Sequence, residues 1–187
     1  MSEKWTLYHT GYQEIREPDV HYGRKNADFG QGFYMTDDPE FAIRWAKERK
    51  GSDTVVNVYE LETEGLKILR LTRDDVWFSY IFGNRAGLAD KYPEADVIVG
   101  PIANDTIYNT LGIFTSGFLK REETLKLLMV GPAYQQIVLK TEKAAQNLTW
   151  ISARVLTGEE IGTYRATVAE EEAAYQRELA EKLEAKV

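Results

Sequence analysis

The stretch Asp28-Phe29-Gly30-Gln31-Gly32-Phe33-Tyr34-Met35-Thr36 is a glycine-spaced turn that runs directly into a short β-type segment. Gly30 and Gly32 lack a Cβ, so they can adopt backbone angles closed to other residues and leave room for a ligand beside the main chain. Tyr34 follows the turn at once, and Trp45 lies eleven residues further on. An amphipathic ring beside such a turn suits a planar heterocycle, so we expect the functional site here.

The segments on either side of this stretch predict an α+β fold, because β-branched alternating runs are interleaved with capped helical patterns. We expect strands at residues 5–9, 32–36, 54–61, 66–71, 96–100, 136–140 and 149–156. We expect helices at residues 39–50, 74–92 (with a break near 83–87), 122–130 and 141–148, and one capped by Asn104 or Asp105. The alanine- and glutamate-rich residues 159–187 predict a helical tail.

The length of 187 residues and an apolar content of 43% fit one compact domain with a full hydrophobic core. We expect that domain at residues 1–157, followed by an acidic C-terminal helix at 158–187. This helix packs on the domain, frays, or docks a partner protein. The formal net charge is -7, much of it in the tail, which disfavours extended nucleic-acid binding.

Two further features bear on location and metal chemistry. The chain has no cysteine, which excludes disulfides, thiolate zinc sites and cysteine nucleophiles. No apolar run reaches bilayer length, and the first residues lack the layout of a signal peptide. We therefore expect a cytoplasmic protein without a membrane partner. The only histidines, His9 and His21, stand twelve residues apart and make a poor zinc pair, so no metal site is expected.

Several common catalytic motifs are missing from the sequence. There is no glycine-rich phosphate loop that ends in Lys-Ser or Lys-Thr, and no Gly-x-Ser-x-Gly elbow. Gly30 and Gly32 precede a strand instead of opening a helix, so they do not form a Rossmann fingerprint. The remaining candidates are histidine, aromatic rings, loop Arg and Asn residues, and a late Gln or Glu.

Three separated motifs carry a family resemblance. Leu7-Tyr8-His9, Phe29-Gly30-Gln31-Gly32-Phe33-Tyr34 and Gln136-Ile137-Val138 resemble the three-part signature of the ADP-ribosyltransferase superfamily, in its diphtheria-toxin and poly(ADP-ribose)-polymerase branch. That branch carries a His on the first strand, a Tyr after Gly-x-Gly-aromatic, and a Glu or other residue opening a late strand. The resemblance implies a His-Tyr-Gln variant with a split β-sandwich, surrounding helices and a C-terminal helical tail.

Two further segments narrow this resemblance. Gly23-Arg24-Lys25-Asn26-Ala27-Asp28-Phe29-Gly30 and the run from Asp96 to Asp105 resemble a bacterial family of uncharacterised domains placed in that superfamily. Members of that family are often toxin-like components found beside a small partner gene. The resemblance covers roughly residues 5–150. It implies NAD as the substrate and a small antitoxin-like protein as a partner.

The resemblance assigns roles to three ring-bearing residues. His9 would orient the ribose of NAD, Tyr34 would stack on the nicotinamide, and Trp45 would offer a second stacking ring. Each residue also has a purely structural alternative. His9 could be a partly buried strand residue satisfied by backbone, Tyr34 an ordinary core aromatic, and Trp45 a helix residue that faces the core.

The rest of the implied NAD site comes from main chain and loop. Thr10 stands where many relatives have Gly, and its main-chain groups would clamp the carboxamide. Arg24 could contact the pyrophosphate, or be a solvated surface residue. Asn26 and Asp28 would shape the loop through side-chain turns. The implied cofactor-binding residues are His9, Thr10, Arg24, Asn26, Gly32, Phe33, Tyr34 and Trp45.

The third catalytic position departs from the best-known pattern. A Glu there would stabilise the oxocarbenium-like charge that develops as nicotinamide leaves. Gln136 can orient the ribose but cannot act as a general base. Single transfer or weak glycohydrolysis is therefore expected in place of chain formation. Gln135 and Glu142 are alternative residues for this position.

The sequence is therefore interpreted as an NAD-dependent mono-ADP-ribosyltransferase with His9, Tyr34 and Gln136 as its catalytic residues. The acceptor is unknown, and the acidic charge favours protein over nucleic acid. Three alternatives stay open. They are an NAD glycohydrolase, a related 2′-phosphotransferase, and a catalytically degenerate module that binds a partner through its acidic helix.

Overall fold

The computed structural model describes residues 3–44, 46, 49–103, 120, 122–123 and 134–184. Its strands are β1 (Lys4–Gly11), β2 (Phe33–Met35), β3 (Val55–Glu62), β4 (Ile68–Arg70), β5 (Val97–Pro101), β6 (Gln135–Leu139) and β7 (Leu148–Val155). The helices within these residues are α1 (Pro39–Arg44), α2 (Asp75–Arg85), α5 (Glu142–Gln146) and α6 (Gly158–Glu184).

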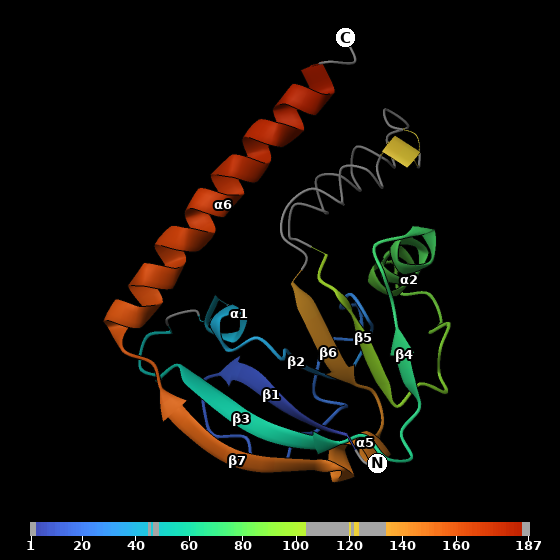
Figure 1. Cartoon of the computed structure of the whole chain (residues 1–187), viewed down its shortest axis with the longest axis vertical. Helices are drawn as coiled ribbons and strands as arrows, with labels where there is room; N and C mark the ends of the chain where they lie inside the picture. The colour runs from blue at the N-terminus through green and yellow to red at the C-terminus, as the bar shows by residue number, and fades with distance from the viewer. Residues whose placement is uncertain are drawn as a thin grey trace.

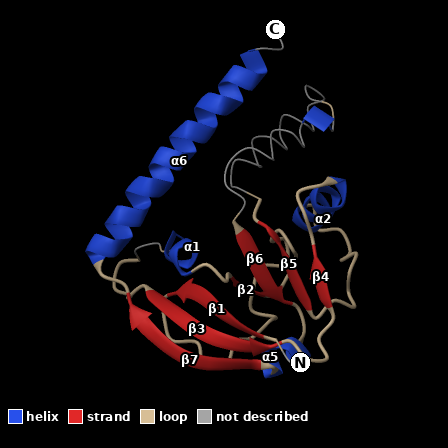
Figure 2. Ribbon diagram, viewed as in Figure 1, coloured by secondary structure: helices blue, strands red, loops and turns tan. Residues whose placement is uncertain are grey.

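The strands form two sheets, so the α+β prediction is confirmed (Figure 2). One sheet has the order β1-β3-β7 and is antiparallel throughout. The other has the order β2-β6-β5-β4, in which only β4 and β5 run parallel. All seven predicted strands are found, with ends that differ by one or two residues.

The two sheets meet where β1 passes β2. The Tyr8 N–H donates to the Thr36 carbonyl at 2.8 Å, and the Thr36 N–H donates to the Tyr8 carbonyl at 3.0 Å. This pair is an isolated bridge and not part of a longer ladder. The sheets are therefore joined at one point and diverge on either side of it.

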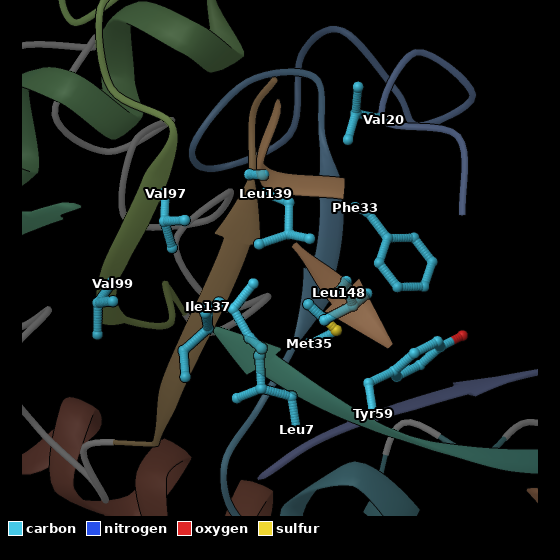
Figure 3. Close-up of a cluster of buried hydrophobic side chains, with 12 residues drawn as sticks. Leu7, Val20, Phe33, Met35, Tyr59, Val97, Val99, Ile137, Leu139 and Leu148 are labelled. Carbon is cyan, nitrogen blue, oxygen red and sulfur yellow. The ribbon is translucent and has the colours of Figure 1, made fainter. Parts of the chain in front are cut away.

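The main apolar core fills the space between the sheets (Figure 3). Leu7 of β1 and Tyr59 of β3 face it from one sheet, while Met35 and Leu139 face it from the other. Each of these four side chains is fully buried. Burying side chains of this size is the main favourable contribution to folding, which explains why the two sheets stay together across a single bridge.

A second apolar cluster lies between α2 and the four-stranded sheet. Asp74 caps α2, because its carboxylate accepts from the N–H groups of Val76 and Trp77. The buried Trp77 indole then donates to the Pro101 carbonyl at 2.9 Å, which ties the helix to the end of β5. Trp77 is the largest fully buried side chain of the described residues.

The helices predicted at residues 39–50 and 74–92 extend well beyond the observed α1 and α2, and the helix predicted at 141–148 extends slightly beyond α5. Residues 74–92 do not form one interrupted helix. The helix ends at Arg85, and Gly87 then takes φ +73°. Gly87 at positive φ explains the end of α2, because a glycine in this conformation just past the last turn stops a helix. Helix α1 ends at Arg44, and Arg49 bridges to Ser52 in a separate turn that contains Gly51 at φ +78°.

Some predictions fall on residues outside the described ranges. These are Trp45, the caps at Asn104 or Asp105, and all of the helix expected at 122–130 except residues 122–123. None of the helices in the described part of the chain combines the length and apolar content that crossing a membrane requires.

The C-terminal helix α6 is the longest element and runs past α1 and then beyond the sheets (Figure 1). Its less exposed side chains follow helical spacing along one stripe: Ile161, Tyr164, Thr167, Glu171 and Tyr175. At its base, Ile161 and Tyr164 pack with Ile43 of α1 and Val56 of β3 in a third apolar cluster. The predicted helical tail is therefore present, and its first half packs on the body of the protein.

Candidate functional site

The divergence of β1 from β2 leaves main-chain groups at a strand edge. In an antiparallel strand the N–H and C=O of alternate residues point to the same edge. Because those of Tyr8 point to Thr36, those of Thr10 also point toward β2. The bridge between β1 and β2 is isolated, so the ladder does not continue to Thr10. The Thr10 hydroxyl is bonded elsewhere, to the Ala42 carbonyl of α1 at 2.5 Å.

His9 lies at this divergence. Its Nδ1 is 2.7 Å from the carbonyl oxygen of Tyr34. A carbonyl only accepts, so Nδ1 carries the proton and Nε2 is left as an acceptor. Burial lowers the pKa of His9, and the hydrogen bond to the Tyr34 carbonyl opposes this shift only in part. The imidazole is therefore neutral at pH 7, with a defined tautomer.

The His9 ring is held between an aromatic side chain and a glycine. Its centroid lies 4.5 Å from that of Phe33. A Cβ at Gly11 would lie 3.3 Å from His9 Nε2. A side chain at position 11 would therefore crowd the acceptor nitrogen. The sequence analysis missed Gly11, although a glycine two residues after a candidate strand histidine is a usable signal.

A buried amide anchors the loop that follows β1. Asn57 of β3 is paired with His9 across the sheet and is fully buried. Its Oδ1 accepts from the Ile15 N–H at 2.9 Å and the Trp150 indole N–H at 3.2 Å. The Tyr59 hydroxyl donates to the Ile15 carbonyl at 2.6 Å. The sequence analysis missed Asn57, whose signal is an Asn inside a run of Val residues.

The Tyr34 hydroxyl closes the glycine turn. It donates to the Gly30 carbonyl at 2.6 Å and accepts from the Phe29 N–H at 3.0 Å. The ring packs against the second apolar cluster. Burial raises the pKa of the Tyr34 phenol, so the hydroxyl stays protonated and able to donate. These contacts match the core-aromatic interpretation of Tyr34.

Asp28 connects the glycine turn to α2, to β6 and to the segment that follows β5. Its Oδ1 accepts from Arg85 Nε at 2.7 Å, and its Oδ2 accepts from the Ala103 N–H at 3.1 Å. Gln136 Nε2 reaches the same Oδ2 at 3.4 Å, and Asn84 Nδ2 donates to the Asp28 carbonyl at 2.9 Å. Gln136 is only 4% exposed, so the described contacts make it a partner of Asp28. Asp28 thus does more than shape its own loop.

Lysine and tyrosine side chains fill the space beside Gly30. Lys140 Nζ donates to the Phe29 carbonyl and lies 3.1 Å from Asp90 Oδ2. The Tyr80 hydroxyl donates to Asp90 Oδ1 at 2.9 Å. Gly30 has φ +74°, and a Cβ there would lie 2.9 Å from Lys140 Nζ. The room expected for a ligand beside Gly30 is therefore occupied by Lys140.

Gly32 is also needed for packing. A Cβ at this position would lie 2.6 Å from both the Leu139 carbonyl oxygen and Val138 Cγ1 of β6. A Cβ at Gly23 would lie 2.5 Å from the Gly32 carbonyl oxygen. Three backbone segments thus approach one another at the two glycines. The prediction that Gly32 leaves space for a ligand is wrong on this face, because β6 fills it.

The three residues expected to surround one ligand lie on two sides of β2. Successive strand residues point to opposite faces, so Phe33 and Tyr34 face different clusters. His9 contacts Phe33, while Gln136 lies on the Tyr34 face, two residues along β6 from Val138, which pairs with Tyr34. The structure brings His9 to the main chain of Tyr34, and not to its ring.

The remaining candidates are spread over the surface. Arg24 and Asn26 are exposed, and Arg24 lies close enough to Tyr34 to oppose the rise of its pKa. Gln135 is exposed at the start of β6. Glu142 pairs with His21 at 3.7 Å and borders a groove of about 440 Å³ beside residues 16–20. It does not belong to the divergence at His9.

Comparisons with known proteins place the chain in a family. A search of curated proteins found no match, and a search of solved structures found none either. The family model described as a protein of unknown function (DUF3990) matches residues 5–150. Because this match covers more than half of the chain, the protein belongs to the DUF3990 family.

Proposed function

We propose that this protein is an NAD-dependent mono-ADP-ribosyltransferase with the split β-sandwich of that superfamily. The observation that carries the proposal is the divergence of β1 and β2 beside a neutral histidine. There the Thr10 main chain faces an edge that β2 does not cover, and His9 is fixed by the Tyr34 carbonyl. This arrangement combines a donor, an acceptor and an oriented ring nitrogen.

These groups match the chemistry of a nicotinamide riboside. A primary carboxamide has one carbonyl acceptor and an NH₂ donor, which complement the N–H and C=O of Thr10. A ribose hydroxyl can donate to the unprotonated Nε2 of His9. Both contacts orient the ligand, and neither needs a charged side chain. Such a site fixes the orientation of the ligand more than it provides tight binding.

The bond broken in the proposed reaction joins C1′ of the ribose to the nicotinamide nitrogen. Nicotinamide leaves with the bonding electron pair, positive charge develops on the ribose, and an acceptor nucleophile attacks C1′ and loses its proton. Gln136 offers only a dipole, and its nearest described carboxylate, Asp28, is paired with Arg85. Transfer of single units, at a modest rate, is therefore expected.

Tyr34 and Gln136 have a supporting role in this proposal. Tyr34 closes the turn at Gly30, and Gln136 bonds to Asp28, which holds that turn to α2. Both therefore position β2 and its carbonyl, which fixes His9. The stacking partner of the nicotinamide remains a prediction, because Trp45 lies outside the described residues.

The proposal extends to the acceptor and the biological setting. A net charge of -7 favours a protein acceptor over a nucleic acid, because extended phosphate contacts require clustered Lys and Arg. NAD is a cytoplasmic metabolite, so the reaction would take place in the cytoplasm. The resemblance to toxin-like domains adds a role as a toxin with a small antitoxin-like partner.

The test incubates purified protein with labelled NAD and a cell lysate, and sorts the label into protein, nucleic acid and free ADP-ribose. His9→Gln should reduce nicotinamide release about 10²–10³-fold, the scale of losing one preorganised contact. His21→Gln is the matched control and should leave the rate unchanged, because His21 is exposed and pairs with Glu142.

The outcomes separate the alternatives. Label on protein identifies a transferase, and label only in free ADP-ribose identifies an NAD glycohydrolase. Absence of nicotinamide release together with absence of a thermal shift at millimolar NAD overturns the proposal in favour of a binding module.

A further inference from the structure

The middle of α6 is attached to the body through one carboxylate. Glu171 Oε2 accepts from Arg44 Nη1 of α1, and Glu171 Oε1 accepts from the Tyr134 hydroxyl at 3.2 Å. Each carboxylate oxygen thus has its own donor, and the two donors come from different elements. Tyr134 directly precedes β6, whereas α1 packs on β1, so this contact also links the two sheets.

Contacts that do not involve Glu171 hold the two donors in place. The Tyr134 ring stacks on Phe41 with centroids 4.3 Å apart and planes 7° apart. The Arg44 guanidinium also lies over the Tyr134 ring, 4.7 Å from its centroid. The Arg44 side chain is 15% exposed. A fixed guanidinium and phenol that converge on two oxygens form a receptor for a planar carboxylate.

The protonation states of Arg44 and Tyr134 are those that carboxylate binding requires. The hydrogen bond to Glu171 raises the pKa of Arg44, and burial raises the pKa of the Tyr134 phenol. Both donors therefore keep their protons at neutral pH. Glu171 itself is 37% exposed, so solvent reaches the contact from one side.

The other attachments of α6 differ in kind from this one. At the base, Ile161 and Tyr164 are held by apolar packing. Further along, Tyr175 is buried and influences the pKa of Arg73, which burial lowers. Glu171 lies between these two places. Among the side chains of this stripe, Glu171 is the one whose contact a competing carboxylate ligand can replace.

We propose that Arg44 and Tyr134, backed by Phe41, form a carboxylate-binding site, and that Glu171 occupies it to latch α6 onto the body. The ligand class is a carboxylate side chain. In the closed state the helix supplies it from the same chain. The site admits another carboxylate when the segment around Glu171 moves away from Arg44.

The latch is reversible on energetic grounds. A charge-assisted contact that is partly exposed contributes little compared with a buried pair, because water and salt screen it. The covalent link to β7 gives Glu171 a high effective concentration at the site, so a free carboxylate competes poorly with it. A carboxylate added in solution should therefore bind measurably only when Glu171 is removed.

The first measurement is amide hydrogen exchange in Glu171→Ala and Glu170→Ala. Both variants lose one negative charge from adjacent positions of one helix, and Glu170 is exposed. Exchange between residues 165 and 177 should become about three- to tenfold faster in Glu171→Ala, and stay near wild type in Glu170→Ala. Equal exchange in the two variants would overturn the latch.

The second measurement is the Tm in sodium acetate against sodium chloride at equal ionic strength. Acetate is the probe for the vacated site and should raise the Tm of Glu171→Ala but not that of the wild type or Glu170→Ala. Adding Tyr134→Phe to Glu171→Ala keeps the stacked ring, removes one donor, and should reduce this rise. A rise of the same size in all variants, or none in Glu171→Ala, would overturn the carboxylate site.

Discussion

The edge of β1 beside His9 and the turn at Asp28–Gly30 lie close together but differ in their packing. At the edge, a single bridge joins Tyr8 to Thr36 and the ladder then stops. At the turn, the described contacts fill the space with side chains from α2 and with Lys140, which directly follows β6. The glycine motif lies in the turn that side chains fill, whereas the divergence of β1 from β2 lies at the edge where strand pairing stops.

The glycine motif therefore lies beside the candidate site at His9 without lining it. Gly32 allows β2 to lie against β6, and Tyr34 fastens the turn. The result is a rigid β2 whose Tyr34 carbonyl orients His9. In this arrangement the turn is a support and the β1 edge carries the chemistry. The four predictions that follow test this division, in order of decreasing expected effect.

Removing the charge of Asp28 should have the largest effect on stability. Asp28→Asn leaves the Arg85 guanidinium buried without its carboxylate, since the two side chains are 13% and 8% exposed. Breaking a buried pair from one side typically costs about 3–5 kcal/mol. Urea unfolding should show this loss, while Asp37→Asn, at an exposed carboxylate, should stay near wild type. A similar small change in both variants would mean that Asp28 does not hold the turn.

Adding one methyl group to β2 should have the next largest effect. Gly32→Ala places a Cβ 2.6 Å from the Leu139 carbonyl oxygen, so the strands must separate. A loss of about 2–3 kcal/mol in the free energy of unfolding is expected from such overpacking. Gly162→Ala is the control, because nothing lies within 4 Å of a Cβ there. In a helix interior this control should gain about 0.5–1 kcal/mol.

Removing the Tyr34 hydroxyl should have a smaller effect. Tyr34→Phe leaves the Phe29 N–H and the Gly30 carbonyl without this partner, which should cost about 1–2 kcal/mol of stability. Thermal unfolding measures the loss, with Tyr22→Phe, 91% exposed, as the control. If the turn is only a support, the thermal shift caused by NAD should survive in Tyr34→Phe. Loss of this NAD-dependent thermal shift in Tyr34→Phe would indicate that the Tyr34 hydroxyl contacts the ligand.

Protonation of His9 should produce the smallest effect. Burial lowers its pKa below 6.5, so the unfolded chain binds a proton that the folded protein does not. Stability should therefore fall as the pH drops through about 6.5, by at most about 0.8 kcal/mol at pH 6. Urea unfolding at pH 7.5 and pH 6 measures this. The fall should vanish in His9→Gln and persist in His21→Gln; a fall that persists in both variants would mean that His9 is not buried as a neutral ring.

The local pattern of residues was sufficient to predict most of the elements. Alternation and β-branched residues predicted the seven strands of the described residues, because these features report how a strand buries one face. The capping carboxylate of Asp74 predicted the start of α2. The ends of α1 and α2 were not predicted correctly. The end of α2 is set by Gly87, which adopts a positive φ just past the last turn.

The sequence by itself determined the α+β class, the positions of the strands along the chain, the helical tail and the candidate residues His9, Tyr34 and Gln136. Only the tertiary structure decided which of these lie together. Side-chain period 2 puts Phe33 and Tyr34 on opposite faces of β2, and pairing with β1 and β6 then assigns His9 to one face and Gln136 to the other. Such pairing depends on contacts between distant segments, so no local pattern contains it.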